Sequence, residues 1–334
     1  MVRIVIDAMG GDFAPEVTVA GAVEALQDFS DIHLILSGPK ETLVAELAKY
    51  TYDQSRIEVD DAPDTVGMDE HPGKVVRSKP NSSIVRSAQL VKDGIADAGL
   101  SAGNTGAAMA SALFKIGRIP GVDRPAIGIP LPAAGRFFLL VDGGANADCR
   151  PIHLMQFAKM GSIYAEEVLK VKNPKVGLLN IGEEAEKGNE LVKEVHQMLV
   201  DQEGLNFIGN IEGNDIPAGT ADVVVCDGFV GNIVLKLVEG MWSQFGRTLK
   251  QTIFSGLTGK FSGLLVKNNL TKMKKNLDYA EHGGAPLLGI NGVYIISHGR
   301  SNAKAIKNAI RVARDGVLSG YVEKLKTAIE SENN

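Results

Sequence analysis

A polar turn near the end of the first third of the chain could bind an anion. SAGNTG, residues 101–106, follows an apolar run and precedes an alanine-rich helical pattern. Backbone N–H groups at such a helix N-terminus attract anions, because the helix dipole adds a partial positive charge. An ordinary helix cap would use the same residues. The phosphate-binding candidates in this turn are Ser101, Gly103, Asn104, Thr105 and Gly106.

A second turn of this kind is SHGRSNAK, residues 297–304, before the last long helical pattern. Helix capping again competes with phosphate binding, but the density of hydrogen-bond donors favours contact with an anion. The candidates here are His298, Ser301, Asn302 and Lys304.

NIGEEAEKGN, residues 180–189, contributes a different kind of group. Its Lys187 can bind an anion as a point charge or polarise a carbonyl, and Asn189 adds an amide. The alternative is a solvated charge cluster before a helix. CDGFVGN, residues 226–232, ends in another amide, Asn232.

Acidic residues and glycines in three turns would support these groups. DAMGGD, residues 7–12, directly follows the first apolar run, where a glycine permits a positive φ or the close approach of a ligand. The acidic residues can orient neighbouring donors or cap helices. The supporting residues are Asp7, Gly10, Gly11 and Asp12 in this turn, then Asp142 and Asn146 in DGGANADCRP and Asp227 in CDGFVGN.

Residues 99–103 also satisfy the GxSxG pattern of a serine hydrolase, with Ser101 as the nucleophile. A hydrolase needs an acid and a histidine later in the chain, and His153, His196, His282 and His298 are available. Serine hydrolase is therefore an alternative function.

Two long segments suggest contacts with partners. Residues 60–81 are long for a connection and could form a lid, with Lys74, Arg77 and Lys79 near a phosphate or an acidic partner. Residues 240–277 contain no acidic residue and form a basic amphipathic stretch, suited to an anionic membrane, an acidic protein or a dimer interface. Its membrane or acyl-groove candidates are Phe254, Leu257, Phe261, Leu264, Leu265, Lys272, Lys274 and Lys275.

Short apolar runs that alternate with helical patterns must position these turns. The alternation predicts an α/β fold with a mainly parallel sheet. We expect strands over 3–6, 32–36, 56–59, 96–100, 126–131, 137–141, 176–180, 207–211, 222–226 and 292–296. We expect helices over 16–29, 41–50, 83–93, 105–117, 151–168, 189–202, 231–253 and 301–327. Ligands bind outside the carboxyl ends of parallel strands, so all of these turns should cluster at one edge.

The 334 residues suit a single large domain over 1–330, or two lobes that divide near residue 150, with a protruding segment over 240–277 and a polar tail over 331–334. A net charge of −5 argues against a nucleic-acid binder. The two cysteines indicate no disulfide framework, and the N-terminus lacks a secretory pattern, so we expect a cytoplasmic protein. There is no GxGxxG, P-loop or HExxH motif, which predicts no cofactor and no metal.

The chain as a whole resembles the phosphate acyltransferase family of bacterial phospholipid synthesis, the acyl-carrier-protein:phosphate transacylases often called PlsX. The motifs that carry the resemblance extend from residue 4 to about residue 312: DAMGGDFAP, RSKPNSS, SAGNTGA, GVDRPA, VDGGANADCRP, NIGEEAEKGNE, GNIEGNDI, VVVCDGFVGNIVLK and GGAPLLGINGV.

This resemblance implies that long-chain acyl-[acyl carrier protein] and inorganic phosphate give acyl phosphate and free carrier protein. It further implies a three-layer α/β/α fold similar to the isocitrate and isopropylmalate dehydrogenases, and a homodimer associated peripherally with the inner face of the cell membrane. An acyl-phosphate-using glycerol-3-phosphate acyltransferase would act downstream.

For such a reaction we expect SAGNTG and SHGRSNAK to bind phosphate. Lys187, with Asn189 or Asn232 beside it, would stabilise the thioester oxyanion. The acyl chain would lie near residues 257–266, and a basic rim would receive the acidic carrier protein. A non-catalytic membrane scaffold for lipid enzymes is the third alternative.

Overall fold

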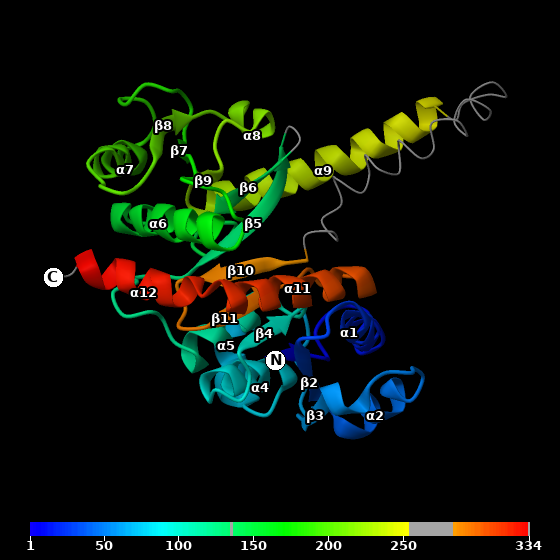
Figure 1. Ribbon diagram of the computed structural model, residues 1–334. Coiled ribbons are helices and arrows are strands. Elements are labelled where there is room, and N and C mark those ends of the chain that lie inside the picture. The colour runs from blue at the N-terminus through cyan, green and yellow to red at the C-terminus, as the bar shows by residue number, and fades with distance from the viewer. Residues whose placement is uncertain (134–135, 254–282, 333–334) are drawn as a thin grey trace.

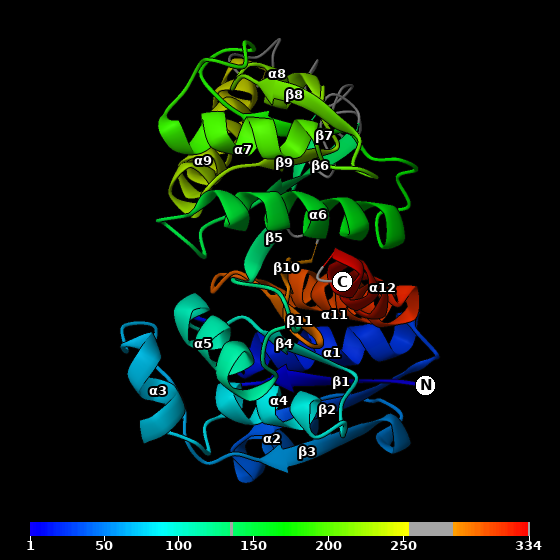
Figure 2. The same ribbon diagram turned by 90° about the vertical axis from the view of Figure 1, so that its left-hand side faces the viewer.

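A single twisted sheet forms the centre of the molecule in the computed structural model, which describes residues 1–133, 136–253 and 283–332 (Figures 1 and 2). Within these residues the strand order is β3-β2-β1-β4-β11-β10-β5-β6-β9-β7-β8. The strands are β1 (Val2–Asp7), β2 (Ile32–Gly38), β3 (Ile57–Asp61), β4 (Ala98–Ser101), β5 (Ala126–Ala133), β6 (Arg136–Val141), β7 (Val176–Leu179), β8 (Phe207–Ile211), β9 (Val223–Val225), β10 (Ala285–Leu288) and β11 (Val293–Ile296).

Helices cover both faces of this sheet, because successive strand residues point to opposite faces and both sets are apolar. Ile4 and Ile6 belong to an apolar cluster with Val19 and Ile306 on one face, whereas Val5 belongs to a cluster with Leu90 on the other face. The predicted three-layer α/β/α fold is confirmed. The helices are α1 (Glu16–Asp28), α2 (Lys40–Leu47), the short 3-10 turn η1 (Gln54–Arg56), α3 (Pro72–Ser78), α4 (Ser83–Lys92), α5 (Thr105–Lys115), α6 (Pro151–Glu167), α7 (Glu190–Val200), α8 (Asp215–Ala218), α9 (Gly228–Ile253), α11 (Ala303–Ser319) and α12 (Tyr321–Glu332).

The sheet consists of two parallel sets of strands that run in opposite directions. β1, β2, β3, β4 and β11 are mutually parallel, and so are β6, β7, β8 and β9. Between the sets, β10 is antiparallel to β11 and to β5, and β5 is antiparallel to β6. Three successive reversals leave the two sets antiparallel to each other. The expectation that all functional turns lie at one edge is therefore wrong, since the carboxyl ends of the two sets lie at opposite edges.

Five local differences separate the structure from the sequence-based expectation. Strand β10 and the short helices α3 and α8 were not predicted. The helix expected over 301–327 is two helices, because Gly320 has a left-handed φ of 67° that ends α11. α9 begins at Gly228, three residues before its expected start. Among the described helices, none is long and apolar enough to cross a membrane.

Candidate functional site

Three of the predicted turns meet at one edge of the sheet. Ser101 at the end of β4 pairs with Asp7 at the end of β1, and with Ile296 at the end of β11. The Ser297 N–H donates to the Ser101 carbonyl at 2.8 Å, and the Asp12 N–H donates to the Gly299 carbonyl at 2.8 Å. We call residues 7–12, 101–106 and 297–304 the anion turns. Their predicted convergence is confirmed.

The N-termini of two long helices lie at the anion turns. Asn104 caps α5 by accepting the Ala107 N–H at 3.0 Å, and Asn302 caps α11 by accepting the Ala305 N–H at 2.9 Å. The ordinary capping interpretation thus holds for both amide oxygens. Thr105 and Gly106 are the first two residues of α5, so their N–H groups have no acceptor within the helix. Thr105 is exposed, and its hydroxyl and N–H groups can face a ligand.

The Ser101 side chain lies below the surface of the anion turns. Its buried hydroxyl donates to Asp7 Oδ2 at 2.7 Å and accepts the Gly103 N–H at 3.1 Å. Burial raises the pKa of Asp7, while the Ser101 hydroxyl acts in the opposite direction. A hydrolase nucleophile must be exposed and paired with a histidine base, and neither condition is met at Ser101.

Close backbone approach explains the two glycines of the first anion turn. A Cβ atom on Gly10 would lie 2.6 Å from Asp7 Oδ2 and 2.7 Å from the Gly103 nitrogen. Gly11 has a φ of 112° and lies against the Gly299 carbonyl. Ser301 is also buried, with its hydroxyl 2.9 Å from that of Ser297, whereas His298 is exposed. The side chains of Ser101 and Ser301 therefore stabilise the anion turns from below.

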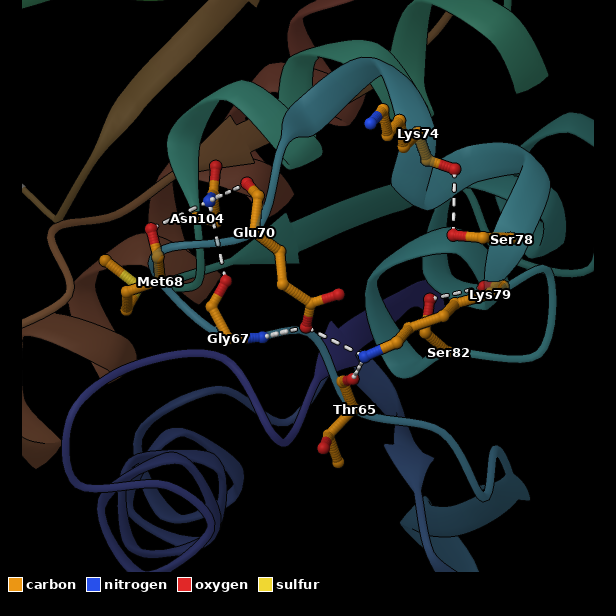
Figure 3. Close-up of polar contacts among 9 residues, drawn as sticks. All are labelled: Thr65, Gly67, Met68, Glu70, Lys74, Ser78, Lys79, Ser82 and Asn104. Carbon is orange, nitrogen blue, oxygen red and sulfur yellow. Dashed lines mark hydrogen bonds and ion pairs between the residues drawn. The ribbon is translucent and has the colours of Figure 1, made fainter.

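The long segment after β3 packs against the anion turns (Figure 3). The Asn104 side-chain NH2 donates to the carbonyls of Met68 at 2.9 Å and Glu70 at 3.1 Å. Lys79 Nζ donates to Glu70 Oε1 at 2.8 Å and to the Thr65 carbonyl at 2.9 Å. Lys79 therefore stabilises this segment. Pro72 at the first position of α3 is the sequence signal that could have identified that helix.

The remaining predicted turns gather at the opposite edge of the sheet. Val225 of β9 pairs with Val141 of β6 and with Leu178 of β7, so the turns over 142–146, 226–232 and 180–189 begin side by side. The Gly228 N–H donates to the Asn146 carbonyl at 2.8 Å. A Cβ atom on Gly144 would lie 3.4 Å from that of Asn232. We call these three turns the Lys187 cluster.

A buried carboxylate organises one turn of the Lys187 cluster. Asp142 Oδ1 accepts the N–H groups of Ile127, Gly144 and Ala145 at 3.0–3.2 Å. Its Oδ2 accepts both the N–H and the side-chain NH2 of Asn146, at 2.7 and 2.9 Å. Burial raises the pKa of Asp142, whereas the donors act in the opposite direction. The sequence predicted a supporting role for Asp142. In the structure its carboxylate accepts several hydrogen bonds and so fixes the backbone of this turn.

Two amides fix the backbone of the Lys187 turn. Asn180 Nδ2 donates to the Lys187 carbonyl at 3.1 Å, and Asn210 Nδ2 donates to the Glu184 carbonyl at 2.9 Å. Lys187 is exposed, while Asn189 caps α7 by accepting the Val192 N–H at 2.9 Å. Asn210 was not among the predicted residues. A polar amide within an apolar strand, FIGNI, is the signal that could have found it.

The predicted residues within the described ranges thus form two groups, and a third set lies outside those ranges. The anion turns follow β1, β4 and β11, whereas the Lys187 cluster follows the oppositely directed β6, β7 and β9. Phe254, Leu257, Phe261, Leu264, Leu265, Lys272, Lys274 and Lys275 lie outside the described residues. Over the ranges that the structure describes, no three His, Cys, Asp or Glu side chains form a potential metal site.

Comparisons with known proteins give one consistent result. A family model described as fatty acid synthesis protein matches residues 2–324. A phosphate acyltransferase from Clostridium novyi (strain NT) is 48% identical over 330 residues, 99% of this chain and 99% of its own length. One from Halothermothrix orenii is 50% identical over 331 residues, again 99% of each chain.

Solved structures share the fold at low sequence identity. A phosphotransacetylase from Streptococcus pyogenes has a TM-score of 0.63 and 17% identity, covering 95% of this chain and 94% of that one. The EutD phosphotransacetylase from Staphylococcus aureus has a TM-score of 0.60, also at 17% identity, with the same coverage. This similarity concerns the architecture alone.

Replacement of Asp142 by alanine is expected to destabilise the protein by at least roughly 3 kcal/mol, because each buried N–H that loses its acceptor costs about 1–3 kcal/mol. Urea unfolding monitored by far-UV circular dichroism measures the change. Asp148→Ala, an exposed position in the same loop, is the control and should shift stability by about 0.5 kcal/mol or less. Equal unfolding midpoints for the two variants would contradict the role of Asp142.

Proposed function

This chain belongs to the phosphate acyltransferase family of fatty acid synthesis proteins and is an acyltransferase, and from that premise we propose that it transfers a long-chain acyl group from acyl carrier protein to inorganic phosphate. The observation that carries the proposal is the meeting of two helix N-termini at the anion turns. Two helix N-termini attract a phosphate through the partial positive charges of their N–H groups, without surrounding it by cations.

Phosphate would bind to the N–H groups of the first turns of α5 and α11 and to the Thr105 hydroxyl. His298, Asn302 and Lys304 would contribute the remaining contacts. Partial charges of backbone groups suit this task, because a phosphate oxygen neutralised by several full charges would be a poor nucleophile. Ser101 and Ser301 act indirectly, since both are buried and stabilise the turns.

The reaction would be a direct displacement at the thioester. An oxygen of hydrogen phosphate attacks the carbonyl carbon, the C–S bond breaks, and the proton of the phosphate ends on the carrier thiol. Lys187, with Asn232 or Asn189, would stabilise the negative charge on the carbonyl oxygen. Positioning can supply on the order of 7–11 kcal/mol, and each oxyanion donor about 3 kcal/mol. No covalent acyl-serine intermediate is required.

With this donor and this product, the reaction would belong to phospholipid synthesis. An acidic carrier protein is expected to dock on a basic rim that includes Lys272, Lys274 and Lys275, and the acyl chain to lie near residues 257–266. The acyl phosphate would then pass to a glycerol-3-phosphate acyltransferase. We place the enzyme in the cytoplasm, bound peripherally to the inner face of the cell membrane.

Lys187→Ala is expected to lower phosphate-dependent release of carrier thiol at least about a hundredfold, because one oxyanion donor is lost. A thiol-reactive chromophore measures the rate. Lys193→Ala, which removes another lysine on the adjacent helix α7, is the control and should retain activity.

The two alternative functions predict different results. A serine hydrolase would cleave esters without phosphate and react with a fluorophosphonate at Ser101. A membrane scaffold would bind vesicles and release no thiol. An unaffected Lys187→Ala variant would remove Lys187 from the mechanism.

Charge reversal at Lys272, Lys274 and Lys275 is expected to weaken binding to anionic vesicles, because each lysine near such a surface contributes about 1 kcal/mol. Sedimentation with phosphatidylglycerol vesicles measures binding. Reversal of Lys170, Lys172 and Lys175, which are exposed and equal in charge, is the control. Unchanged sedimentation of the first triple variant would count against membrane association.

A homodimer would bury an apolar stripe on α9. Phe229, Ile233, Leu237, Met241 and Phe245 recur every four residues and are 50–63% exposed in the single chain. Residues four apart are neighbours on a helix surface, and each such step turns by about 40°, so these side chains form a stripe that winds around α9. Large exposed patches of this kind mark interaction sites.

Leu237→Glu, at the centre of the stripe, is expected to convert the dimer to a monomer because it places a charge in the interface. Sedimentation velocity measures the mass, and Trp242 fluorescence reports the change on α9. Leu318→Glu, an equally exposed leucine on α11, is the control that should leave the dimer intact. A dimeric Leu237→Glu variant would show that the stripe is not the interface.

A further inference from the structure

The segment after β3 contacts two of the anion turns. Pro72 occupies space that a Cβ atom on Gly106, in the first turn of α5, would need. Met68 Cε lies 3.0 Å from the position of a Cβ atom on Gly299, in the turn before α11. We call residues 65–79 the cover segment. The two glycines allow it to pack closely against both helix N-termini.

One side chain joins the cover segment to α5. Asn104 Oδ1 caps the helix, while its Nδ2 lies 3.5, 2.9 and 3.1 Å from the carbonyl oxygens of Gly67, Met68 and Glu70 (Figure 3). Asn104 is buried, so these hydrogen bonds are shielded from water. The same side chain therefore fixes the helix N-terminus and the backbone packed against it.

A second set of contacts closes the cover segment on itself. Glu70 Oε1 accepts the Gly67 N–H at 2.7 Å and Lys79 Nζ at 2.8 Å, and Lys79 Nζ also donates to the Thr65 carbonyl at 2.9 Å. The Lys79 and Glu70 side chains are 35% and 32% exposed, so water can replace these contacts. Val75 is buried in an apolar cluster with residues of α5. The tip of the segment can thus open while its base stays packed.

Exclusion of water would decide which product this site forms. Attack of a phosphate oxygen on the thioester carbonyl gives acyl phosphate and the carrier thiol. Attack of a water oxygen breaks the same C–S bond and gives a free fatty acid and the same thiol, with a proton from water on the sulfur. Closure of a loop over an active site expels water and suppresses such hydrolysis.

We propose that the cover segment selects phosphate over water as the acyl acceptor, with Met68 and Pro72 as its contacts on the anion turns and Lys79 as the residue that holds it closed. This inference rests on the proposed function and specifies the selectivity of the same site. Thr105 stays exposed beside the covered Gly106, so phosphate retains access to the N-terminus of α5.

Lys79→Met is expected to raise the share of acyl groups released as free fatty acid about three- to tenfold, because the loss of one charged anchor opens the segment more often. At saturating phosphate, mass spectrometry measures the fatty acid, and a thiol-reactive chromophore measures the total carrier released. Lys74→Met is the matched control. It removes an equal charge from an exposed position of the same segment, where the amino group forms no hydrogen bond or ion pair with the described residues.

Two further variants separate closure from charge and from folding. Met68→Ala removes the contact on Gly299 but leaves the lysine in place, and it should also raise the fatty acid share. Lys79→Arg retains a cation and should give a smaller share than Lys79→Met. A purely structural role would lower the rate of thiol release and leave the share unchanged.

The outcomes distinguish this inference from the proposed function. Increases in Lys79→Met and Met68→Ala, without one in Lys74→Met, would establish the role of the cover segment. A wild-type share in Lys79→Met or in Met68→Ala would overturn it, and so would equal increases in Lys79→Met and Lys74→Met. In each of these cases the wild type still forms acyl phosphate. Absence of phosphate-dependent thiol release from the wild type would refute the proposed function itself.

Discussion

The antiparallel pairing of β10 and β5 determines where each functional turn of this molecule lies. β10 has four residues and β5 has eight, and together they join two parallel sets that would otherwise be separate sheets. Because side chains and turns follow strand direction, the reversal directs one group of turns to one edge and the other group to the opposite edge. The hydrophobic core is not divided in the same way, since one apolar cluster extends across both sets of strands.

Within each group, buried carboxylates and close glycines fix the turns at the level of single atoms. Asp7 accepts from the Ser101 hydroxyl beneath the anion turns, and Asp142 accepts five N–H hydrogens from four residues in the Lys187 cluster. Gly10 and Gly231 allow neighbouring backbones to approach more closely than any Cβ atom would permit. Such contacts fix the directions of backbone N–H groups in advance, and an anion site made of backbone needs that preorganisation.

The sequence predicted the components of the site better than their grouping. Asn104 and Asn302 were recognisable as residues before helices, but the same pattern fits a cap and a phosphate ligand, and in the structure both amide oxygens cap. Ser101 matched a hydrolase motif of five residues, although its hydroxyl is buried against Asp7. Asn210 was missed, because its partner, the Glu184 carbonyl, is 26 residues away and only the isolated amide in the apolar strand FIGNI marks the position.

By itself the sequence determined the elements and their chemistry. Apolar periodicity specified ten of the strands and the main helices, since burial of alternate residues is a local property of the chain, and the polar turns between them were equally local. Only the tertiary structure decided the direction of the strands around Ala285–Leu288, a four-residue segment whose strand conformation depends on its partners β11 and β5. Strand direction depends on which segments pair across the sheet, and pairing is a non-local choice that periodicity does not encode. That choice directs the turn of Lys187 and the anion turns to opposite edges of the sheet.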